Sequence, residues 1–267
     1  MLPEVMISEI MSFAATGVKE LVQVYGVVDW RWRGCGQSPL VHGKLSLTGE
    51  LGVGSPVYKD VESEEDMVRV VGSVVTSVPG LTDLNIPWEK RKFIDTECLR
   101  VISTSCRFLK TLHLAVSNVG NWTDLEPLVS LEVLRLSRTT IDDAGLESVR
   151  QLTKLKVLSL RDTAISDEGL GRISSLTDLT KLFLGGTSIS NAGLKFLKPL
   201  VNLKVLVLDR TAITEEGLSL LATSHPNLEW LCLSSNNMSD KGVVHLLKFT
   251  SLLTLDVEST QITEAQE

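Results

Sequence analysis

Aromatic residues are scarce in this sequence: they make up 5% of its 267 residues, whereas hydrophobic residues together make up 43%. Leucine and valine therefore supply most of the apolar volume. That composition is unusual for a compact enzyme with a deep pocket. It suits thin, regularly stacked layers, in which branched aliphatic side chains of similar volume pack well. The composition thus favours a layered architecture with one long core.

Cysteine and histidine are also sparse, with four of each. No two cysteines form a CxxC pair and no histidine-rich segment accompanies them, which argues against a zinc site and against a disulfide framework. We interpret the cysteines as small buried hydrophobic residues in a reducing compartment. They are Cys35, Cys98, Cys106 and Cys232.

The sequence lacks long hydrophobic runs and an excess of positive charge. Glu4 and Glu9 fall where a signal peptide would have a basic start and an unbroken apolar stretch, and no run approaches the length of a membrane span. The net charge of −7 gives no general attraction to nucleic acid or anionic lipid. We therefore expect an intracellular protein, cytoplasmic or nuclear, that binds no membrane, and nucleic acid is disfavoured as a partner.

What the sequence does contain is an internal repeat. The pattern LxxLxL recurs at intervals of 24 or 25 residues, and two earlier copies begin at Leu81 and Leu109. The regular copies begin at Leu131, Leu155, Leu179, Leu203, Leu228 and Leu252. A fixed period of this length is the signature of a solenoid.

A second motif follows each of these strands with the same period. It reads TTIDDAGL from Thr139, TAISDEGL from Thr163, TSISNAGL from Thr187 and TAITEEGL from Thr211. Together the two motifs resemble the leucine-rich-repeat superfamily over residues 81–267. The resemblance implies an α/β solenoid, or horseshoe, with a parallel sheet on the concave side and helices on the convex side.

Elementary geometry explains both motifs. The spaced leucines point inward from a short strand, and a 24-residue period is long enough for the crossover that parallel strands need. The polar residues that open the second motif are expected to bridge adjacent turns through their side chains. These residues are Thr139, Thr163, Thr187, Thr211, Asn236 and Thr260. Helix N-caps are predicted at Asp142, Ser166, Ser190, Thr214 and Ser239, with acidic residues after them placed by the helix dipole.

Residues between the leucines face outward from the concave sheet, and many of them are apolar. We predict that this face binds a protein partner, with Phe183 and Trp230 as anchors, because aromatic residues dominate binding hot spots. The apolar positions are Val133, Val157, Phe183, Val205, Val207, Trp230 and Cys232. Charged residues are expected to flank them, with Arg135, Arg161 and Lys181 on one side and Asp209, Asp256 and Glu258 on the other. Strand propensity alone is an alternative explanation for Val133 and Val157, but it explains the aromatic residues poorly.

Residues 1–36 do not follow the repeat. They present Leu-Pro, then Ile and Ser-Phe, then a spaced Leu and Val, and finally Trp-Arg, an order that resembles an F-box. The residues concerned are Leu2, Pro3, Ile7, Ile10, Phe13, Leu21, Val24, Trp30 and Trp32. The segment departs from the F-box pattern at Ala14 and over residues 26–29. The resemblance implies a helical segment that docks on a Skp1-type linker of a cullin ubiquitin ligase, while the repeats capture the substrate. The alternative is a helical cap over the first repeat.

Residues 37–80 form the least regular part, which we interpret as an irregular first repeat and linker. Ser63 and Asp66 have the spacing of a capping box at the start of a helix. The stretch after them is rich in β-branched residues. A helix is favoured there over a strand because Leu81 must begin the next strand.

Catalytic patterns are missing from the sequence. The histidines fall on different repeats without a matched nucleophile, and no phosphate-binding loop, dinucleotide fingerprint or zinc-protease motif occurs. We therefore predict a non-enzymatic interaction protein without cofactor or metal. Two functions stay open, an F-box substrate adaptor and a structural scaffold or assembly subunit.

Overall fold

The computed structural model describes residues 43–46, 61–77, 80–86 and 88–262. The predicted F-box-like segment 1–36, with all of its proposed linker-binding residues, lies outside this part of the chain. So does most of the predicted linker 37–80, apart from one strand and one helix.

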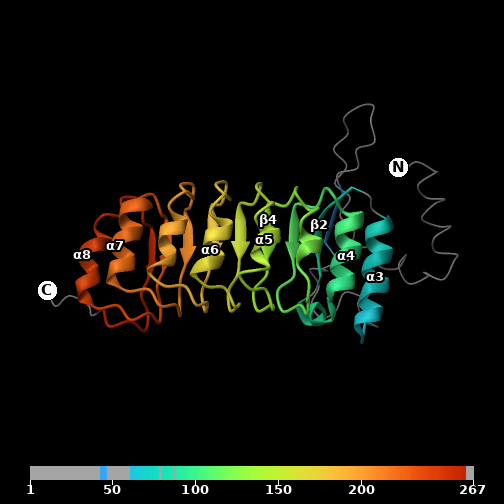
Figure 1. Cartoon of the computed structure of the whole chain (residues 1–267), viewed down its shortest axis with the longest axis horizontal. Coiled ribbons are helices and arrows are strands. Elements are labelled where there is room, and N and C mark those ends of the chain that lie inside the picture. Colours follow the sequence, from blue (N-terminus) through green and yellow to red (C-terminus); the bar gives the residue numbers. More distant parts are fainter. Residues whose placement is uncertain (1–42, 47–60, 78–79, 87, 263–267) are drawn as a thin grey trace, which may run out of the picture.

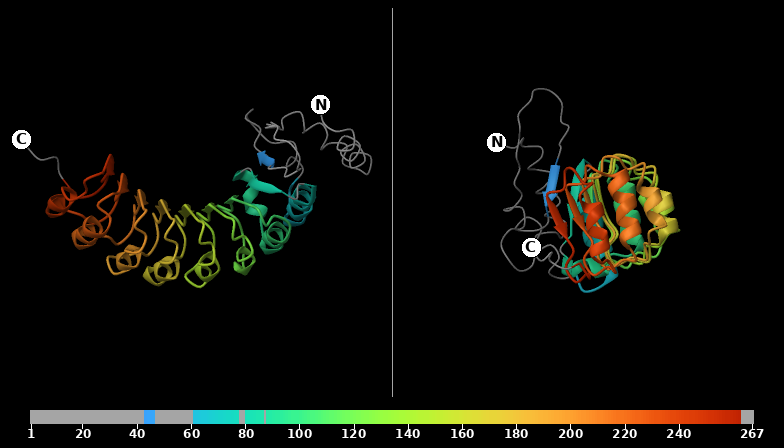
Figure 2. Two further views of the ribbon diagram at one scale, coloured as in Figure 1. Left: turned by 90° about the horizontal axis from the view of Figure 1, so that it is seen from above. Right: turned by 90° about the vertical axis from the view of Figure 1, so that its left-hand side faces the viewer.

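The described chain is a curved solenoid built on a parallel sheet. Its strands follow one another in chain order, and Figure 2 shows them lining the inner side of the curve while the helices line the outer side. The strands are β1 (Gly43–Ser46), β2 (Leu81–Asn85), β3 (Thr111–His113), β4 (Val133–Arg135), β5 (Val157–Ser159), β6 (Lys181–Phe183), β7 (Val205–Val207), β8 (Trp230–Cys232) and β9 (Thr254–Asp256). The predicted repeat architecture is confirmed.

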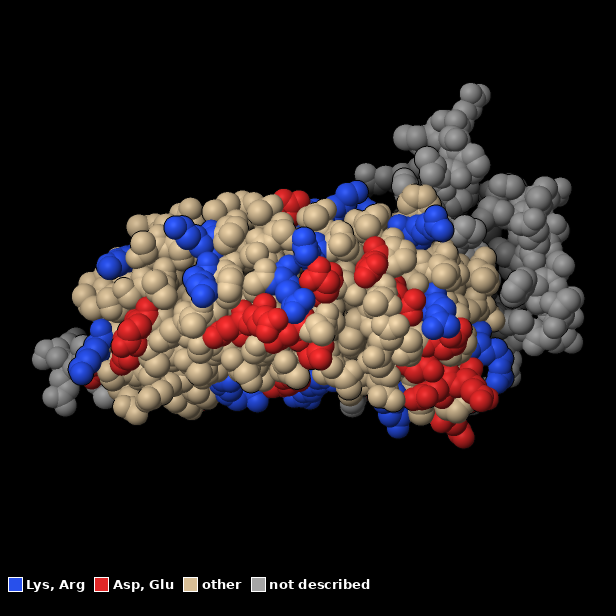
Figure 3. Space-filling model, in the orientation of Figure 1, with Lys and Arg blue, Asp and Glu red and all other residues tan. Residues whose placement is uncertain are grey.

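The convex side carries short helical segments, which face the viewer in Figure 1. They are α3 (Glu64–Ser77), η3 (Trp88–Phe93), α4 (Thr96–Ser105), η4 (Thr123–Leu125), α5 (Leu146–Val149), α6 (Asp167–Ile173), η5 (Gly193–Leu197), α7 (Glu215–Ser224), η6 (Asp240–Gly242) and α8 (Val243–Leu246). The capping box before α3 is confirmed, because the Asp66 amide donates to Ser63 Oγ at 3.1 Å and the Glu62 amide donates to Asp66 Oδ2. Positive and negative side chains are interspersed over this face (Figure 3).

One continuous core runs along the solenoid. The central leucines of the strands pair in register, and Leu158, Leu182 and Leu206 have no solvent exposure. Burial decreases in the last described strand, β9, where Leu255 is partly exposed. Each internal repeat is therefore covered by a neighbour on both sides, as a solenoid requires.

The threonines after the strands bond within their own turn, and the predicted bridging between turns is wrong for Thr139, Thr163, Thr187 and Thr260. It holds for Thr211, whose hydroxyl also lies 3.0 Å from Asn236 Oδ1 of the next repeat. Thr139 Oγ1 donates to the Leu136 carbonyl at 2.7 Å, and Thr163, Thr187, Thr211 and Thr260 repeat this bond to the carbonyl three residues earlier. A hydroxyl is short, and this carbonyl lies within its reach. Asn236 does bridge, because its longer amide donates to Leu208 of the preceding repeat as well as to Leu233.

Just before this polar position, each repeat from β3 onward places one residue in the left-handed backbone region. Gly186 occupies it with a φ of 69°, and Val116 occupies it with the same φ. The other residues there are Arg138, Asp162, Arg210, Ser235 and Ser259. The left-handed conformation suits glycine and is least favourable for a β-branched side chain.

A Val116→Gly variant is therefore expected to be more stable than the wild type by about 0.5–1 kcal/mol, the relief of strain exceeding the entropy that glycine loses on folding. Urea denaturation followed by circular dichroism measures the difference. Val129 is a control, since it is also exposed but has no positive φ. There the same substitution should be neutral or destabilising, and equal effects at the two positions would contradict the strain argument.

On the convex side, a polar residue near the start of the helical segment of one repeat forms hydrogen bonds with the residue at the predicted N-cap position of the next repeat. We call this pair of residues the clasp. Asp167 Oδ1 accepts from the Ser190 amide at 2.8 Å, and Asp167 Oδ2 accepts from the Ser190 hydroxyl at 2.6 Å. The other pairs are Asp143 with Ser166, Asn191 with Thr214 and Glu215 with Ser239. The hydrogen bonds from Ser239 hold the pKa of Glu215 down at about 2. Contacts with the next repeat are therefore a second reason for the acidic residues at Asp143, Asp167 and Glu215, beside the predicted helix dipole.

The predicted N-caps act in two ways. Ser166 and Ser190 accept a backbone hydrogen bond two residues ahead, and Asp142 accepts one from Gly145. Thr214 and Ser239 occupy the N-cap position without a side-chain capping bond. The Ser239 hydroxyl donates to Glu215 of the preceding repeat. The Thr214 hydroxyl accepts from Asn191 of the preceding repeat and also donates to Glu216 in its own helix, so at both positions the residue type reflects the clasp at least in part.

Candidate partner-binding face

The apolar centre of the concave face is a small cluster on neighbouring strands. Val205, Val207 and Cys232 pack together, and Phe183 lies against them, partly exposed. The predicted exposure of the first three is wrong, because they are only 9%, 4% and 8% exposed. Strands about 4.8 Å apart place outward side chains in mutual contact, and each covers its neighbour.

Trp230 is the apolar residue of this face that solvent reaches most easily. Its side chain stands on β8, in register with Val205, and it is 46% exposed. Val133 and Val157 are partly exposed on β4 and β5. Phe183 and Trp230, the predicted anchors, thus stand beside a packed apolar cluster on β7 and β8.

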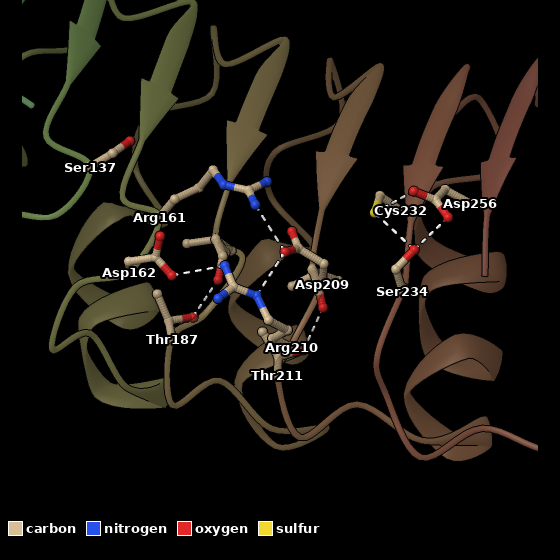
Figure 4. A network of polar contacts seen from close by, with 12 residues as sticks. Ser137, Arg161, Asp162, Thr187, Asp209, Arg210, Thr211, Cys232, Ser234 and Asp256 are labelled. Carbon is tan, nitrogen blue, oxygen red and sulfur yellow. Dashed lines mark hydrogen bonds and ion pairs between the residues drawn. The ribbon is translucent and has the colours of Figure 1, made fainter. Parts of the chain in front are cut away.

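The predicted charged rims are connected to each other rather than separated. Arg161 donates to Asp209 at 2.9 Å, and Arg210 joins Asp209 to Asp162 (Figure 4). Asp162 also pairs with Arg138. The expectation that Arg161 and Asp209 lie on opposite sides of the apolar stretch is therefore wrong. Arg161 follows β5 and Asp209 follows β7, so the arginine side chain spans the intervening repeat to reach the carboxylate.

Two adjacent glycines make room for this network. A Cβ atom at Gly185 would lie 2.1 Å from Asp209 Oδ1, and one at Gly186 would lie 2.2 Å from Asp162 Oδ1. In the sequence, the Gly-Gly pair after β6 is the feature that could have indicated that side chains from neighbouring repeats, here these carboxylates, pack closely against this turn. Asp209 is largely buried, and two arginines offset the cost of burying its charge.

At the far end of the face, Asp256 accepts hydrogen bonds from Ser234 and from the Cys232 thiol (Figure 4). These bonds, the Ser234 bond first, lower the pKa of Asp256. Burial raises the pKa of Cys232, and the charge of Asp256 adds to this effect. Burial likewise raises the pKa of Cys98 to about 12 and that of Cys106 to about 11. Thiols with raised pKa values are poor nucleophiles, so these cysteines have the properties of packing residues.

Lys181 and Arg135 are exposed and have no ion pair among the described residues. Arg135 stands on β4 next to His113 on β3. Arg91, from η3, lies close enough that the charge of Arg135 lowers its pKa, after the larger effect of burial. Arg135 was predicted as part of this face, whereas His113 and Arg91 were not recognised as its neighbours. No pattern signals Arg91, because η3 interrupts the repeat.

His113 is expected to make the protein less stable as the pH falls from about 6.5 to 4. Burial, reinforced by the charges of Arg135 and Arg91 and opposed by Asp83, lowers the pKa of His113 to about 4. Below pH 6.5 the unfolded chain binds a proton at this residue, while the folded chain does not, so the free energy of unfolding falls until about pH 4. Above pH 6.5 both states are neutral and the contribution is constant.

An NMR titration of the His113 ring tests this directly, and a pKa above 6 would contradict it. A His113→Gln variant should lose stability less steeply over the same pH range. Part of the slope should remain, because burial also lowers the pKa of His225.

Two further observations concern the part of the chain that the structure describes. It contains no cluster of three or more histidine, cysteine, aspartate or glutamate side chains arranged for a metal ion. None of its helices has the length and apolarity needed to cross a bilayer. The absence of enzymatic activity stays a prediction.

Comparison with known proteins agrees with this fold. A family profile described as Leucine Rich repeat matches residues 128–149 and 151–174. An internalin (InlF) from Listeria monocytogenes superposes with a TM-score of 0.55 at 22% identity, over 73% of this chain and 59% of the internalin. A second internalin (InlC2) from the same organism gives a TM-score of 0.48 at 21% identity, over 70% of this chain and 92% of that one.

The chain thus spans less than two thirds of the length of the first internalin. No curated protein matches the sequence, and the predicted F-box resemblance finds no support in these comparisons. The chain carries leucine-rich repeats, and its fold is that of a leucine-rich-repeat solenoid.

Proposed function

We propose that this solenoid is a protein–protein interaction module that holds a protein partner on its concave face. The observation that carries the proposal is Trp230, a large apolar side chain that is 46% exposed next to an apolar cluster. A sheet face that only contacts water would need polar residues alone at these positions. Solenoids generally bind partners on this concave surface. An exposed aromatic side chain over an ordered apolar base is the usual form of a binding hot spot.

The polar surroundings support the same function. Arg135 and Lys181 project from β4 and β6 without an ion pair in the described chain, and Glu258 is exposed beyond β9. A polar rim around an apolar centre is the common anatomy of a protein interface. The cluster of Val205, Val207 and Cys232 contributes a fixed shape rather than exposed area.

Affinity capture with matched variants tests the module. A partner retained by the wild-type chain should be lost when Phe183 or Trp230 is replaced by alanine. Phe108→Ala is the control, since Phe108 is 62% exposed in the turn before β3, away from the concave row. A protein retained equally by all variants would contradict the assignment of the concave face.

We further propose, from the F-box resemblance of residues 1–36, that the partner on the repeats is a substrate and that the N-terminal segment docks on a Skp1-type linker inside the cell. The support is the sequence order from Leu2-Pro3 to Trp32-Arg33. Purified linker should bind the full chain and should not bind a Phe13→Asp, Leu21→Asp double variant. If a folded wild-type chain fails to bind the linker, the N-terminus is a cap, and the scaffold function replaces the adaptor function.

A further inference from the structure

One register row crosses the whole concave face, and its chemistry changes along its length. The row runs from His113 and Arg135 through Ser159 to Phe183, and then through Val207 and Cys232 to Asp256. Every residue in it projects from the same position of its strand. A ligand that lies across the strands therefore meets the neutral His113 ring and the Arg135 guanidinium first, then apolar side chains, then a carboxylate.

The positive charge at this end of the row that solvent reaches is that of Arg135, which forms no ion pair among the described residues. Arg135 is exposed on β4, and its charge lowers the pKa of both His113 and Arg91. Asp83 on β2 is the carboxylate whose charge acts on His113 in the opposite direction. Arg91 also donates from Nε to the Ile86 carbonyl at 2.8 Å, which fixes its guanidinium in place. His113 beside Arg135 is uncharged at neutral pH and can still form a hydrogen bond, so an exposed guanidinium next to an imidazole favours an incoming carboxylate.

The apolar end begins two strands away from Arg135. Phe183 is partly exposed there, Val207 lies one strand further, and Trp230 stands beside them on β8. Strands are about 4.8 Å apart, so three strand intervals from Arg135 to Val207 span about 14 Å. An extended peptide advances about 3.3 Å per residue and points alternate side chains to the same side, so residues i and i+4 lie about 13 Å apart and face the same surface.

We infer that the partner presents an extended peptide segment across this row, with an aspartate or glutamate over His113 and Arg135 and a large apolar side chain four residues away over Phe183, Val207 and Trp230. The inference rests on the proposed function and names the chemistry that the concave face selects. The apolar neighbours and the acidic net charge of the chain favour a peptide carboxylate over nucleic acid as the anion.

Selection of peptides on the full chain tests this spacing. A phage-displayed library of random dodecapeptides is selected on immobilised wild-type protein, on Arg135→Glu and on Arg107→Glu. Arg107 is the matched control, because it is exposed in the turn between α4 and β3 and no ion pair forms with it in the described chain. Peptides enriched by the wild type and by the control should carry an acidic residue four positions from a large apolar residue. Arg135→Glu should lose the acidic preference, and its affinity for a synthetic wild-type-selected peptide should fall about tenfold or more.

Two further variants separate failure of this inference from failure of the proposed function. Binding of the selected peptides should be lost in Phe183→Ala and Trp230→Ala. In a second outcome, binding is lost in these two variants while the peptides show no acidic preference and Arg135→Glu binds them as the wild type does. That result overturns the predicted acidic residue of the partner, and the concave face remains the binding site. If the peptides bind regardless of Phe183 and Trp230, the proposed function is contradicted as well. Absence of any enrichment overturns the extended-segment inference, and the affinity-capture experiment then decides the proposed function alone.

Discussion

A Gly193→Ala variant is expected to lose about 3 kcal/mol of stability, although alanine normally favours a helix over glycine. The added Cβ atom would lie 2.2 Å from Asp167 Oδ1 and 3.3 Å from the backbone Cα atom of Asp167. The carboxylate must move away, and it then loses its two hydrogen bonds to Ser190. The variant therefore breaks the clasp between two repeats in the middle of the solenoid.

Gly171→Ala is the matched control. Gly171 also lies in a helical segment, α6, but a Cβ atom there would meet only the Phe196 ring at 3.5 Å or more, an ordinary contact. This variant should be neutral or up to about 1 kcal/mol more stable, in line with helix propensity. Urea denaturation of both variants gives the comparison, and equal effects would refute the role of the clasp.

A double-mutant cycle identifies the cause of the loss. In an Asp167→Ala background the carboxylate is absent, so Gly193→Ala should cost little further stability. Residues in contact usually show such coupling, whereas independent sites show additive effects. Additive losses would mean that Gly193 is required for another reason.

The repeat spacing predicted the fold because its physical causes are local. Leu158 and Leu182 point inward since strand side chains alternate, and any 24-residue crossover returns the chain to the next parallel strand. The capping box at Ser63 and Asp66 is equally local and was predicted correctly. These features depend on residues a few positions apart.

Contacts between repeats were harder to predict. Val207 is buried because Phe183 and Cys232 stand beside it, and both are about one period away in the sequence. The ion pair of Arg161 with Asp209 joins residues two repeats apart. The alternation of side chains along each strand predicts which residues face outward. It does not predict what fraction of each outward side chain is buried by the residues on neighbouring strands. The charged rim was misplaced for the same reason.

The clasp was present in the sequence but was assigned to a different cause. Asp143 and Asp167 fit the helix-dipole explanation, and the glycine that recurs at the seventh position of each motif, such as Gly169 and Gly193, had no assigned role. The structure joins the two observations, since the glycine of one repeat lies against the carboxylate of the repeat before it. A signal that recurs with the period of a solenoid can report a contact between repeats as readily as one within a repeat.

The position of a leucine along the solenoid is expected to decide how much stability it contributes. Leu182 in β6 and Leu255 in β9 occupy the same inward position of their strands, and successive strands between them pair in register. Leu182 is fully buried and has a repeat on either side, whereas Leu255 is partly exposed in the last described strand. Leu182→Ala should cost about 3–4 kcal/mol, the sum of lost transfer free energy and an unfilled cavity.

Leu255→Ala should cost about 1 kcal/mol, because part of the side chain is already in contact with water and the surrounding repeat can relax. Denaturant unfolding measures both values, and hydrogen exchange shows where each loss falls. In a solenoid whose repeats contact only their neighbours, Leu182→Ala should weaken amide protection in β5, β6 and β7, and Leu255→Ala should weaken it only near β8 and β9. Equal losses at the two leucines would mean that the chain unfolds as one unit whose stability does not depend on neighbour contacts, and the clasp between Asp167 and Ser190 would then have no special importance for the central repeats.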